Sequence, residues 1–178
     1  MDRFLDAKFL LFGLILGYFA FPIANSQQNI CLDGSVNAII SPAAADQKLH
    51  AINSAKSSLH IILYEFSYPD LKEALINAKR RGVDVKIILE PKVDQNLKTA
   101  TFLKGKGIEV RWANPKFNNS HAKTAIIDGK TVIVGSLNWS RNAMERNREI
   151  GVLLESQKIA DELEGVFESD WDLGLEVN

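Results

Sequence analysis

Cysteine and histidine are scarce in this chain of 178 residues. There is one cysteine, Cys31, and there are three histidines, His50, His60 and His121. A single cysteine excludes a disulfide within the chain and a cysteine-rich zinc site, and three scattered histidines argue against a histidine-rich metal centre. We therefore expect neither a metal ion nor any other cofactor. Cys31 is interpreted as a free thiol, and His50 and His60 as structural residues.

Internal repeats, low-complexity stretches and long linkers are also absent, so nothing divides the chain into several domains. The composition, with 46% hydrophobic and 24% charged residues, is typical of a globular protein rather than a disordered one. We expect a single domain over residues 27–178.

The long apolar run at residues 9–23 lies near the amino terminus and follows two basic residues. Residues 24–26 then supply the small-x-small pattern that precedes signal-peptidase cleavage. Residues 1–26 are therefore predicted to be a secretory signal, which would place residues 27–178 in the periplasm or outside the cell. A retained membrane anchor is the alternative, although the run is shorter than the roughly 20 residues that a spanning helix needs.

From residue 36 onward, strand-like and helix-like segments alternate. Strands are expected over residues 36–40, 59–66, 83–89, 108–112, 121–127, 131–134 and 150–154, and helices after Ser41-Pro42, after Pro69, over residues 94–104 and after Ser156. Ser41 would cap the first of these helices and Pro42 would open it. The alternation predicts an α/β domain with a mixed, largely parallel β-sheet that is flanked by helices on both faces.

The most informative segment covers residues 119–149 and reads NSHAKTAIIDGKTVIVGSLNWSRNAMERNRE. Alternation places His121 and Lys123 on the same face of a strand. An Asp-Gly pair at residues 128–129, between two β-branched runs, predicts a two-residue hairpin turn. That turn would place His121 directly opposite Ser136.

The side chains that converge there suit a phosphate ester. Lys123 supplies a positive charge, and Ser136 and Asn138 supply neutral donors for the phosphate oxygens. His121 is then left to act as a nucleophile or a general acid.

Two further residues of the segment have structural roles in this interpretation. Gly135 allows the backbone to approach closely, because it has no side chain. Asp128 lies in the turn at odd spacing from His121, so we expect it to support the hairpin rather than the chemistry.

The pattern HxKx4Dx6GSxN, which begins at His121, resembles the HKD motif of the phospholipase D superfamily. Glu149 resembles the acidic residue that supports the histidine in that family. The likeness extends less specifically over roughly residues 36–171. A short chain with a single motif is similar to the small secreted bacterial endonucleases of the superfamily.

The resemblance implies a two-step reaction that needs no metal ion. His121 would attack phosphorus to give a phosphohistidine, a second histidine would protonate the leaving oxygen, and water would release the product. Lys123 and Asn138 would hold the phosphate with help from Ser136, and Glu149 would orient His121. Because the chain has one motif, the second histidine must come from another copy, which predicts a homodimer with one shared active site at its two-fold axis.

Charge is distributed unevenly, although the net charge is only −1. Residues 79–148 hold fifteen Lys or Arg against six Asp or Glu, whereas residues 149–178 hold nine acidic residues and one lysine. The basic residues that flank the motif, and that are predicted to bind phosphates of a nucleic acid, are Lys116, Arg141, Arg146 and Arg148. For each of them, an ordinary solvated surface is the competing interpretation.

The leading hypothesis is a metal-independent phosphodiesterase that acts as a non-specific endonuclease on DNA or RNA. A phospholipid-cleaving or phosphatidyl-transferring enzyme is the alternative with the same chemistry, but the single motif and the lack of an aromatic-rich amphipathic loop argue against it. A catalytically idle nucleic-acid-binding module is a third possibility. The intact set of His, Lys, Asn and Glu argues against that module.

Overall fold

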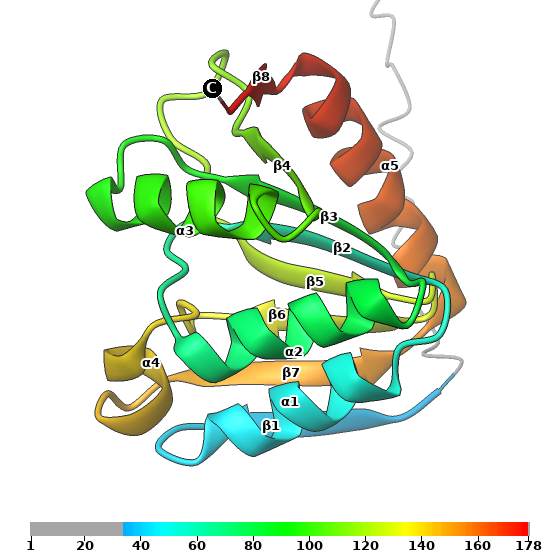
Figure 1. The fold of residues 1–178 in the computed structure, drawn as a ribbon. Coiled ribbons are helices and arrows are strands. Elements are labelled where there is room, and N and C mark those ends of the chain that lie inside the picture. Colours follow the sequence, from blue (N-terminus) through cyan, green and yellow to red (C-terminus); the bar gives the residue numbers. More distant parts are fainter. Residues whose placement is uncertain (1–33, 178) are drawn as a thin grey trace, which may run out of the picture. The chain divides into compact units, whose positions relative to one another are not determined.

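A computed structural model describes residues 34–177, which form an eight-stranded sheet with helices on both faces (Figure 1). The strands are β1 (Val36–Ile40), β2 (Ser58–Leu63), β3 (Asp84–Leu89), β4 (Glu109–Trp112), β5 (Lys123–Ile127), β6 (Thr131–Gly135), β7 (Ile150–Glu155) and β8 (Leu175–Glu176). The helices are α1 (Ala44–Ser54), α2 (Pro69–Arg80), α3 (Asp94–Lys104), α4 (Arg141–Glu145) and α5 (Gln157–Leu173). The predicted signal at residues 1–26 and the predicted free thiol at Cys31 lie outside the described residues.

The strand order is β1-β7-β6-β5-β2-β3-β4-β8. Only the β2–β3 and β3–β4 pairings are parallel, because only these neighbours are joined by helical crossovers, through α2 and α3. The other five pairings are antiparallel. The predicted α/β domain with a mixed sheet is confirmed, but the expectation that the sheet is largely parallel is wrong for its pairings.

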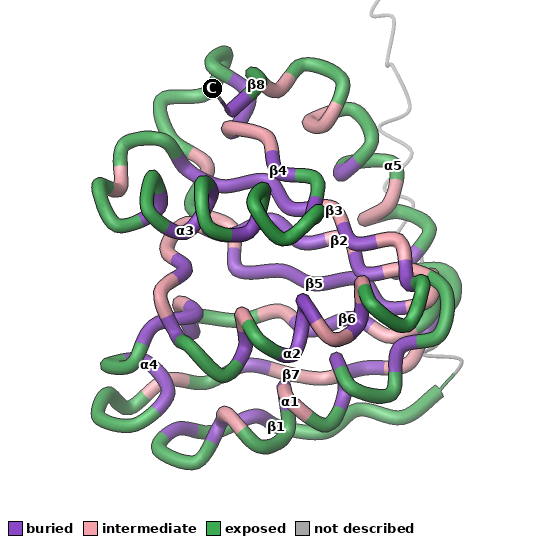
Figure 2. Tube along the Cα trace, in the orientation of Figure 1, coloured by how far each residue is buried: buried purple, intermediate pink, exposed green. Residues whose placement is uncertain are grey.

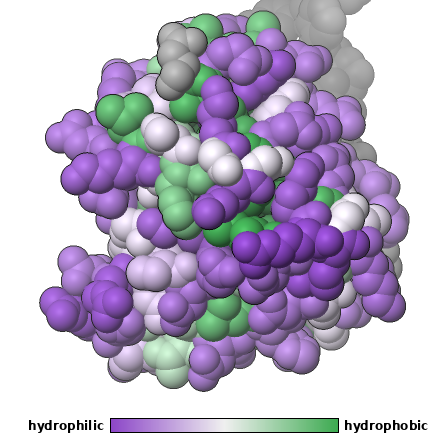
Figure 3. All heavy atoms as spheres, viewed as in Figure 1, coloured by the Kyte–Doolittle hydropathy of each residue, from purple (hydrophilic) through white to green (hydrophobic). Residues whose placement is uncertain are grey.

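The two faces of the sheet bury different cores. Ile61 of β2 packs in the cluster that includes Leu75 of α2, whereas the next residue, Ile62, packs with Phe167 of α5. Alternation along each strand thus divides the apolar side chains between the α1–α2–α3 side and the α5 side. Figure 2 shows buried central strands beneath exposed helix surfaces, and the face seen in Figure 3 is largely hydrophilic with scattered apolar patches. Within residues 34–177, no helix is both long enough and apolar enough to cross a membrane.

The start of α1 differs from the prediction. The helix begins at Ala44, and neither Ser41 nor Pro42 occupies the capping positions. The Ser41 hydroxyl instead donates to the carbonyl of Asn147 and accepts from the backbone N–H of Glu149. A tertiary contact therefore uses the side chain that the local pattern assigned to a cap.

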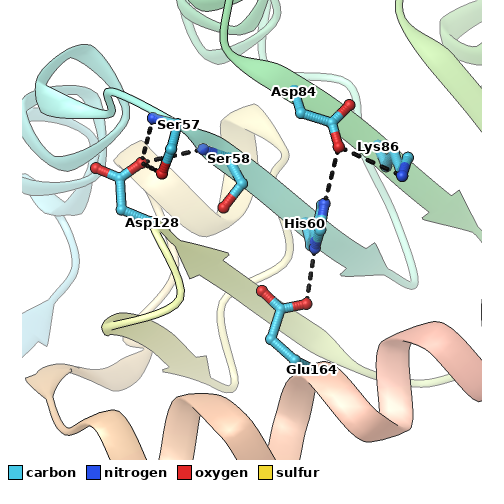
Figure 4. A network of polar contacts seen from close by, with 7 residues as sticks. All are labelled: Ser57, Ser58, His60, Asp84, Lys86, Asp128 and Glu164. Carbon is cyan, nitrogen blue, oxygen red and sulfur yellow. Dashed lines mark hydrogen bonds and ion pairs between the residues drawn. The ribbon is translucent and has the colours of Figure 1, made fainter.

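His60 links β2 to β3 and to α5 (Figure 4). Its Nδ1 lies 2.7 Å from Glu164 Oε2, its Nε2 lies 3.4 Å from Asp84 Oδ2, and its ring stacks on Phe167 at 4.6 Å. Burial lowers the pKa of His60, but the hydrogen bonds and charges of the two carboxylates outweigh it, so the pKa is raised. This is consistent with the structural role predicted for His60.

The raised pKa has a consequence for stability. A folded-state pKa above the unfolded value of about 6.5 means that the protonated His60 stabilises the fold below that pH, and that the stabilisation is lost as pH rises through the folded pKa. His60→Gln, which is neutral at every pH, should therefore destabilise the protein more at pH 5.5 than at pH 9. Denaturant unfolding of both proteins measures the difference, with the exposed His50→Gln as the control. An equal loss at both pH values would contradict the proposed charge effect.

Candidate active site

The β5–β6 connection sets the geometry of the site. Asp128 and Gly129 both have positive φ, 54° and 61°, and the Lys130 N–H donates to the Ile127 carbonyl at 3.1 Å. Strand pairing then resumes with Ile127 opposite Thr131, so the connection has three residues instead of two. The Lys130 carbonyl accepts from the N–H of Ser156, and so it does not take part in the hairpin ladder. The predicted register is wrong by one residue for this reason.

The shift separates His121 from Ser136. A slip of one residue moves a side chain to the other face of the sheet, so the predicted pair cannot form. The Ser136 hydroxyl instead donates to Glu149 Oε2 at 2.5 Å and accepts from the N–H of Ile150 at 3.2 Å. His121 lies in the loop just before β5 and is exposed.

His121 and Lys123 do come together, as the alternation predicts. The Lys123 Nζ lies 2.8 Å from His121 Nδ1 and 3.3 Å from Nε2, and it donates to the His121 carbonyl at 2.7 Å. The ammonium group and the imidazole are therefore within hydrogen-bond distance of each other. The Tyr64 ring packs on the imidazole at 4.3 Å between centroids, and Lys123 Nζ lies 5.0 Å from the centre of the same ring. The imidazole is thus held on two sides while remaining accessible.

Asn138 is held by Glu65, which directly follows β2 in the chain. Its Nδ2 donates to Glu65 Oε2 at 3.0 Å. The other amide atom, Oδ1, is buried and has no partner among the described residues. Unpaired buried polar atoms are rare in folded proteins, so this one calls for an explanation.

Two buried lysines lie close enough to Glu149 to feel its charge. Lys123 is 6% exposed, and burial lowers its pKa, although Glu149 and Glu65 partly offset the effect. Lys48 of α1 is 1% exposed, with its Nζ 5.3 Å from the centre of the Trp139 ring. Burial lowers the pKa of Lys48 to about 7, against the opposing attraction of Glu149. Both lysines therefore lie where water is largely excluded and their charged forms are disfavoured, and a nearby anion would favour those charged forms.

Glu149 does not contact His121 through any hydrogen bond in residues 34–177. Its Oε2 accepts from Ser136, and its Oε1 accepts from Asn147 Nδ2 at 3.1 Å. The orienting role expected for Glu149 stays a prediction, since in this structure its direct partner is the serine.

Asp128 lies at the opposite end of β5, about 16 Å from Lys123 by the rise of a strand. Its carboxylate accepts from the N–H groups of Ser57 and Ser58 at 2.7 and 3.1 Å and from the Ser57 hydroxyl at 2.9 Å (Figure 4). It also accepts from the N–H of Lys56 at 3.0 Å. Burial raises the pKa of Asp128, but these hydrogen bonds lower it further than burial raises it. The residue anchors the hairpin to the segment before β2 and is remote from His121.

The remaining predicted residues have varied surroundings. Gly135 lies so close to the partner strand that a Cβ there would come within 2.4 Å of the Gly151 Cα. Arg148 donates to the Ser41 carbonyl at 2.9 Å, which gives its guanidinium a structural contact, and Arg141 pairs with Glu145 at 3.5 Å. The other two flanking basic residues, Lys116 and Arg146, have exposed side chains.

The sequence pattern did not predict three residues near the site, Tyr64, Glu65 and Lys48. Tyr64 and Glu65 directly follow β2, so their place at the carboxyl end of a buried strand was the available signal. For Lys48 the only hint was a basic residue on the apolar side of a helix. Within residues 34–177, no three His, Cys, Asp or Glu side chains are placed to bind one metal ion.

Comparison with known families gives one model that covers most of the chain. Residues 49–171 match the family described as "Cardiolipin synthase, PLD-like domain". Mitochondrial cardiolipin hydrolase from Mus musculus is 33% identical over 133 residues, which are 74% of this chain and 60% of the mouse protein. The chain therefore spans less than two thirds of the length of this relative.

Two solved structures share the fold over most of the described residues. Nuc from Salmonella typhimurium, a phospholipase D family member, superposes with a TM-score of 0.75 at 32% identity, covering 80% of this chain and 97% of Nuc. NucT from Helicobacter pylori also has a TM-score of 0.75, at 25% identity, covering 81% of this chain and 99% of NucT.

The lowered pKa of Lys48 predicts a specific pH dependence. Between pH 7 and 10.5 the unfolded chain binds a proton that the folded protein has lost, so stability should rise with pH across this window. Lys48→Met should be more stable than the parent near pH 6, by at most about 5 kcal/mol, and this gain should shrink toward pH 9.5. Denaturant unfolding at several pH values tests this, with the exposed Lys98→Met as the control. A gain that is independent of pH would refute the burial of a titrating lysine.

Proposed function

This chain belongs to the family of phospholipase D-like domains, whose members act on phosphodiester bonds, and from that premise we propose that it is a metal-independent endonuclease of DNA or RNA. The observation that carries the proposal is the contact of Lys123 Nζ, at the start of β5, with Nδ1 of the exposed His121. Asn138, held by Glu65 after β2, supplies the amide. An imidazole, a cation and an amide donor are groups that suit nucleophilic attack on a phosphodiester.

The reaction we propose proceeds in two steps. A ring nitrogen of His121 attacks phosphorus, and the bond to the leaving oxygen breaks as a second histidine donates its proton. Water then attacks the phosphohistidine, with that second histidine now acting as the base, and His121 is released. Lys123 and Asn138 hold the phosphate oxygens, while Glu149 keeps Ser136 in place and offsets the charge of the buried lysines.

The second histidine is proposed to be His121 of another copy. His60 is stacked on Phe167 on the α5 side of the sheet, and His50 lies exposed on α1, so neither belongs to the cluster around Lys123. A two-fold homodimer would bring two copies of His121 to one phosphate. The exposure of His121 in the single chain leaves it accessible to such a partner.

Nucleic acid is preferred over lipid as the substrate for two reasons. The excess of basic residues in residues 79–148 suits a polyanion, and the likeness to Nuc and NucT supports the same assignment. The likeness to a cardiolipin hydrolase keeps phospholipid cleavage as the second candidate. We propose a periplasmic or secreted location on the basis of the predicted signal at residues 1–26, with a retained membrane anchor as the alternative.

Activity in excess chelator tests the proposed chemistry. Plasmid DNA, RNA and cardiolipin-containing vesicles are each incubated with the purified protein and EDTA, and we expect cleavage of nucleic acid only. His121→Ala should abolish turnover, and Lys123→Ala and Asn138→Ala should each lower the rate on the order of 10²-fold or more, as loss of transition-state donors does. His50→Ala should retain full activity. An absolute requirement for a divalent cation, or cleavage of lipid alone, would overturn the proposal.

Mixed dimers test the shared site. Parent and His121→Ala chains are co-expressed at varied ratios, and the specific activity of the pooled protein is measured. A dimer with one altered chain lacks either the nucleophile or the acid, so activity should follow the square of the parent fraction. Mixing with His50→Ala should leave activity constant. A straight line with His121→Ala would show that each chain works alone.

A further inference from the structure

Phe117 projects from the loop between β4 and β5, four residues before His121. Its side chain is 53% exposed. A single exposed apolar side chain is ordinary on a protein surface. This one is unusual in its setting, because the loop that carries it leads directly into the candidate nucleophile.

The loop is held rigidly rather than left free. The Glu90 carboxylate is 2% exposed, and its two oxygens accept from the N–H groups of Lys92 at 3.0 Å and Ser120 at 2.6 Å. The side-chain oxygen of Asn114 accepts from the backbone N–H of Lys116 at 3.0 Å. The backbone carbonyl of Asn114 accepts from the backbone N–H of Phe117 at 3.3 Å. The ring is therefore presented by a pre-organised backbone, so little entropy would be lost on binding a ligand.

A hollow of about 170 Å³ lies beside the ring. Its apolar lining comes from Pro91, Ala113, Pro115 and Leu175 together with Phe117. Lys92 also lines the hollow, and its Nζ donates to the Asn118 carbonyl. Glu90 also lines the hollow, but it is buried, and both of its carboxylate oxygens accept hydrogen bonds from backbone N–H groups. The hollow thus combines a flat aromatic face with a cationic rim.

We propose that Phe117 and this hollow form a subsite for an unstacked nucleobase next to the phosphate that His121 attacks. The inference rests on the proposed nuclease function and specifies its substrate as single-stranded. An aromatic face binds any base by stacking, whereas bases paired within a duplex have both faces covered by their neighbours. Lys92, which lines the hollow, and the exposed Lys116, which directly precedes Phe117, supply cations for the phosphates that flank such a base.

The test compares two single-stranded oligonucleotides of the same length and charge. One carries bases throughout, and the other carries abasic residues at every position around the cleavage site. Loss of one base–aromatic stack corresponds to roughly a 5- to 150-fold change. We therefore expect Phe117→Ala to lower kcat/KM by that factor on the base-containing strand and to leave the abasic strand unchanged. Phe117→Trp should preserve the preference, and Phe102→Ala, which removes an exposed ring on α3, should have no effect.

Three results would overturn the inference. An equal loss on both strands would mean that Phe117 acts by positioning the His121 loop, and no loss on either would mean that the ring is plain surface. A change of oligomeric state in Phe117→Ala, measured by light scattering, would assign the ring to a contact between copies. If the parent protein cleaves neither strand, the proposed nuclease function itself fails, and that outcome is distinct from the other three.

Discussion

The junction between the segment after β6 and the segment after β2 holds the site together. Trp139 is fully buried, and its backbone N–H donates to the backbone carbonyl of Glu65 at 3.0 Å. Its carbonyl accepts from the N–H groups of Ser67 and Tyr68 at 2.8 and 2.9 Å, and its indole packs edge-on against Phe66 at 5.3 Å between centroids. These bonds satisfy backbone groups that would otherwise be buried without partners. They also join the segment after β6 to the segment after β2.

Burial and charge oppose each other at this edge. Lys48 and Lys123 both have lowered pKa values because burial disfavours their charged forms, and Glu149 only partly compensates. An anion bound near these lysines would favour their charged forms.

The motif spans β5 because the two ends of this strand have different tasks. At one end Lys123 contacts His121, and at the other end Asp128 accepts hydrogen bonds from the segment before β2. Since β5 pairs with β2 along its whole length, an anchor at the turn also aligns the far end. Asp128, which is remote from His121, can thus control the position of this candidate nucleophile through the register of one strand pair.

Local periodicity was enough to predict the bounds of β1 and α3 and the neighbouring positions of His121 and Lys123, because these depend only on the repeat of a single element. It missed α4 and β8, which are too short to show a repeat. Local sequence patterns were therefore sufficient for the alternation of helices and strands, the mixed α/β class and the types of side chain at the site. The hairpin register, the pairing of Ser136 with Glu149 and the positions of Tyr64, Glu65 and Lys48 became visible only in the folded chain. The physical reason is that register and partners depend on bonds between segments far apart in the chain, such as the one from Lys130 to Ser156, and no local pattern records them.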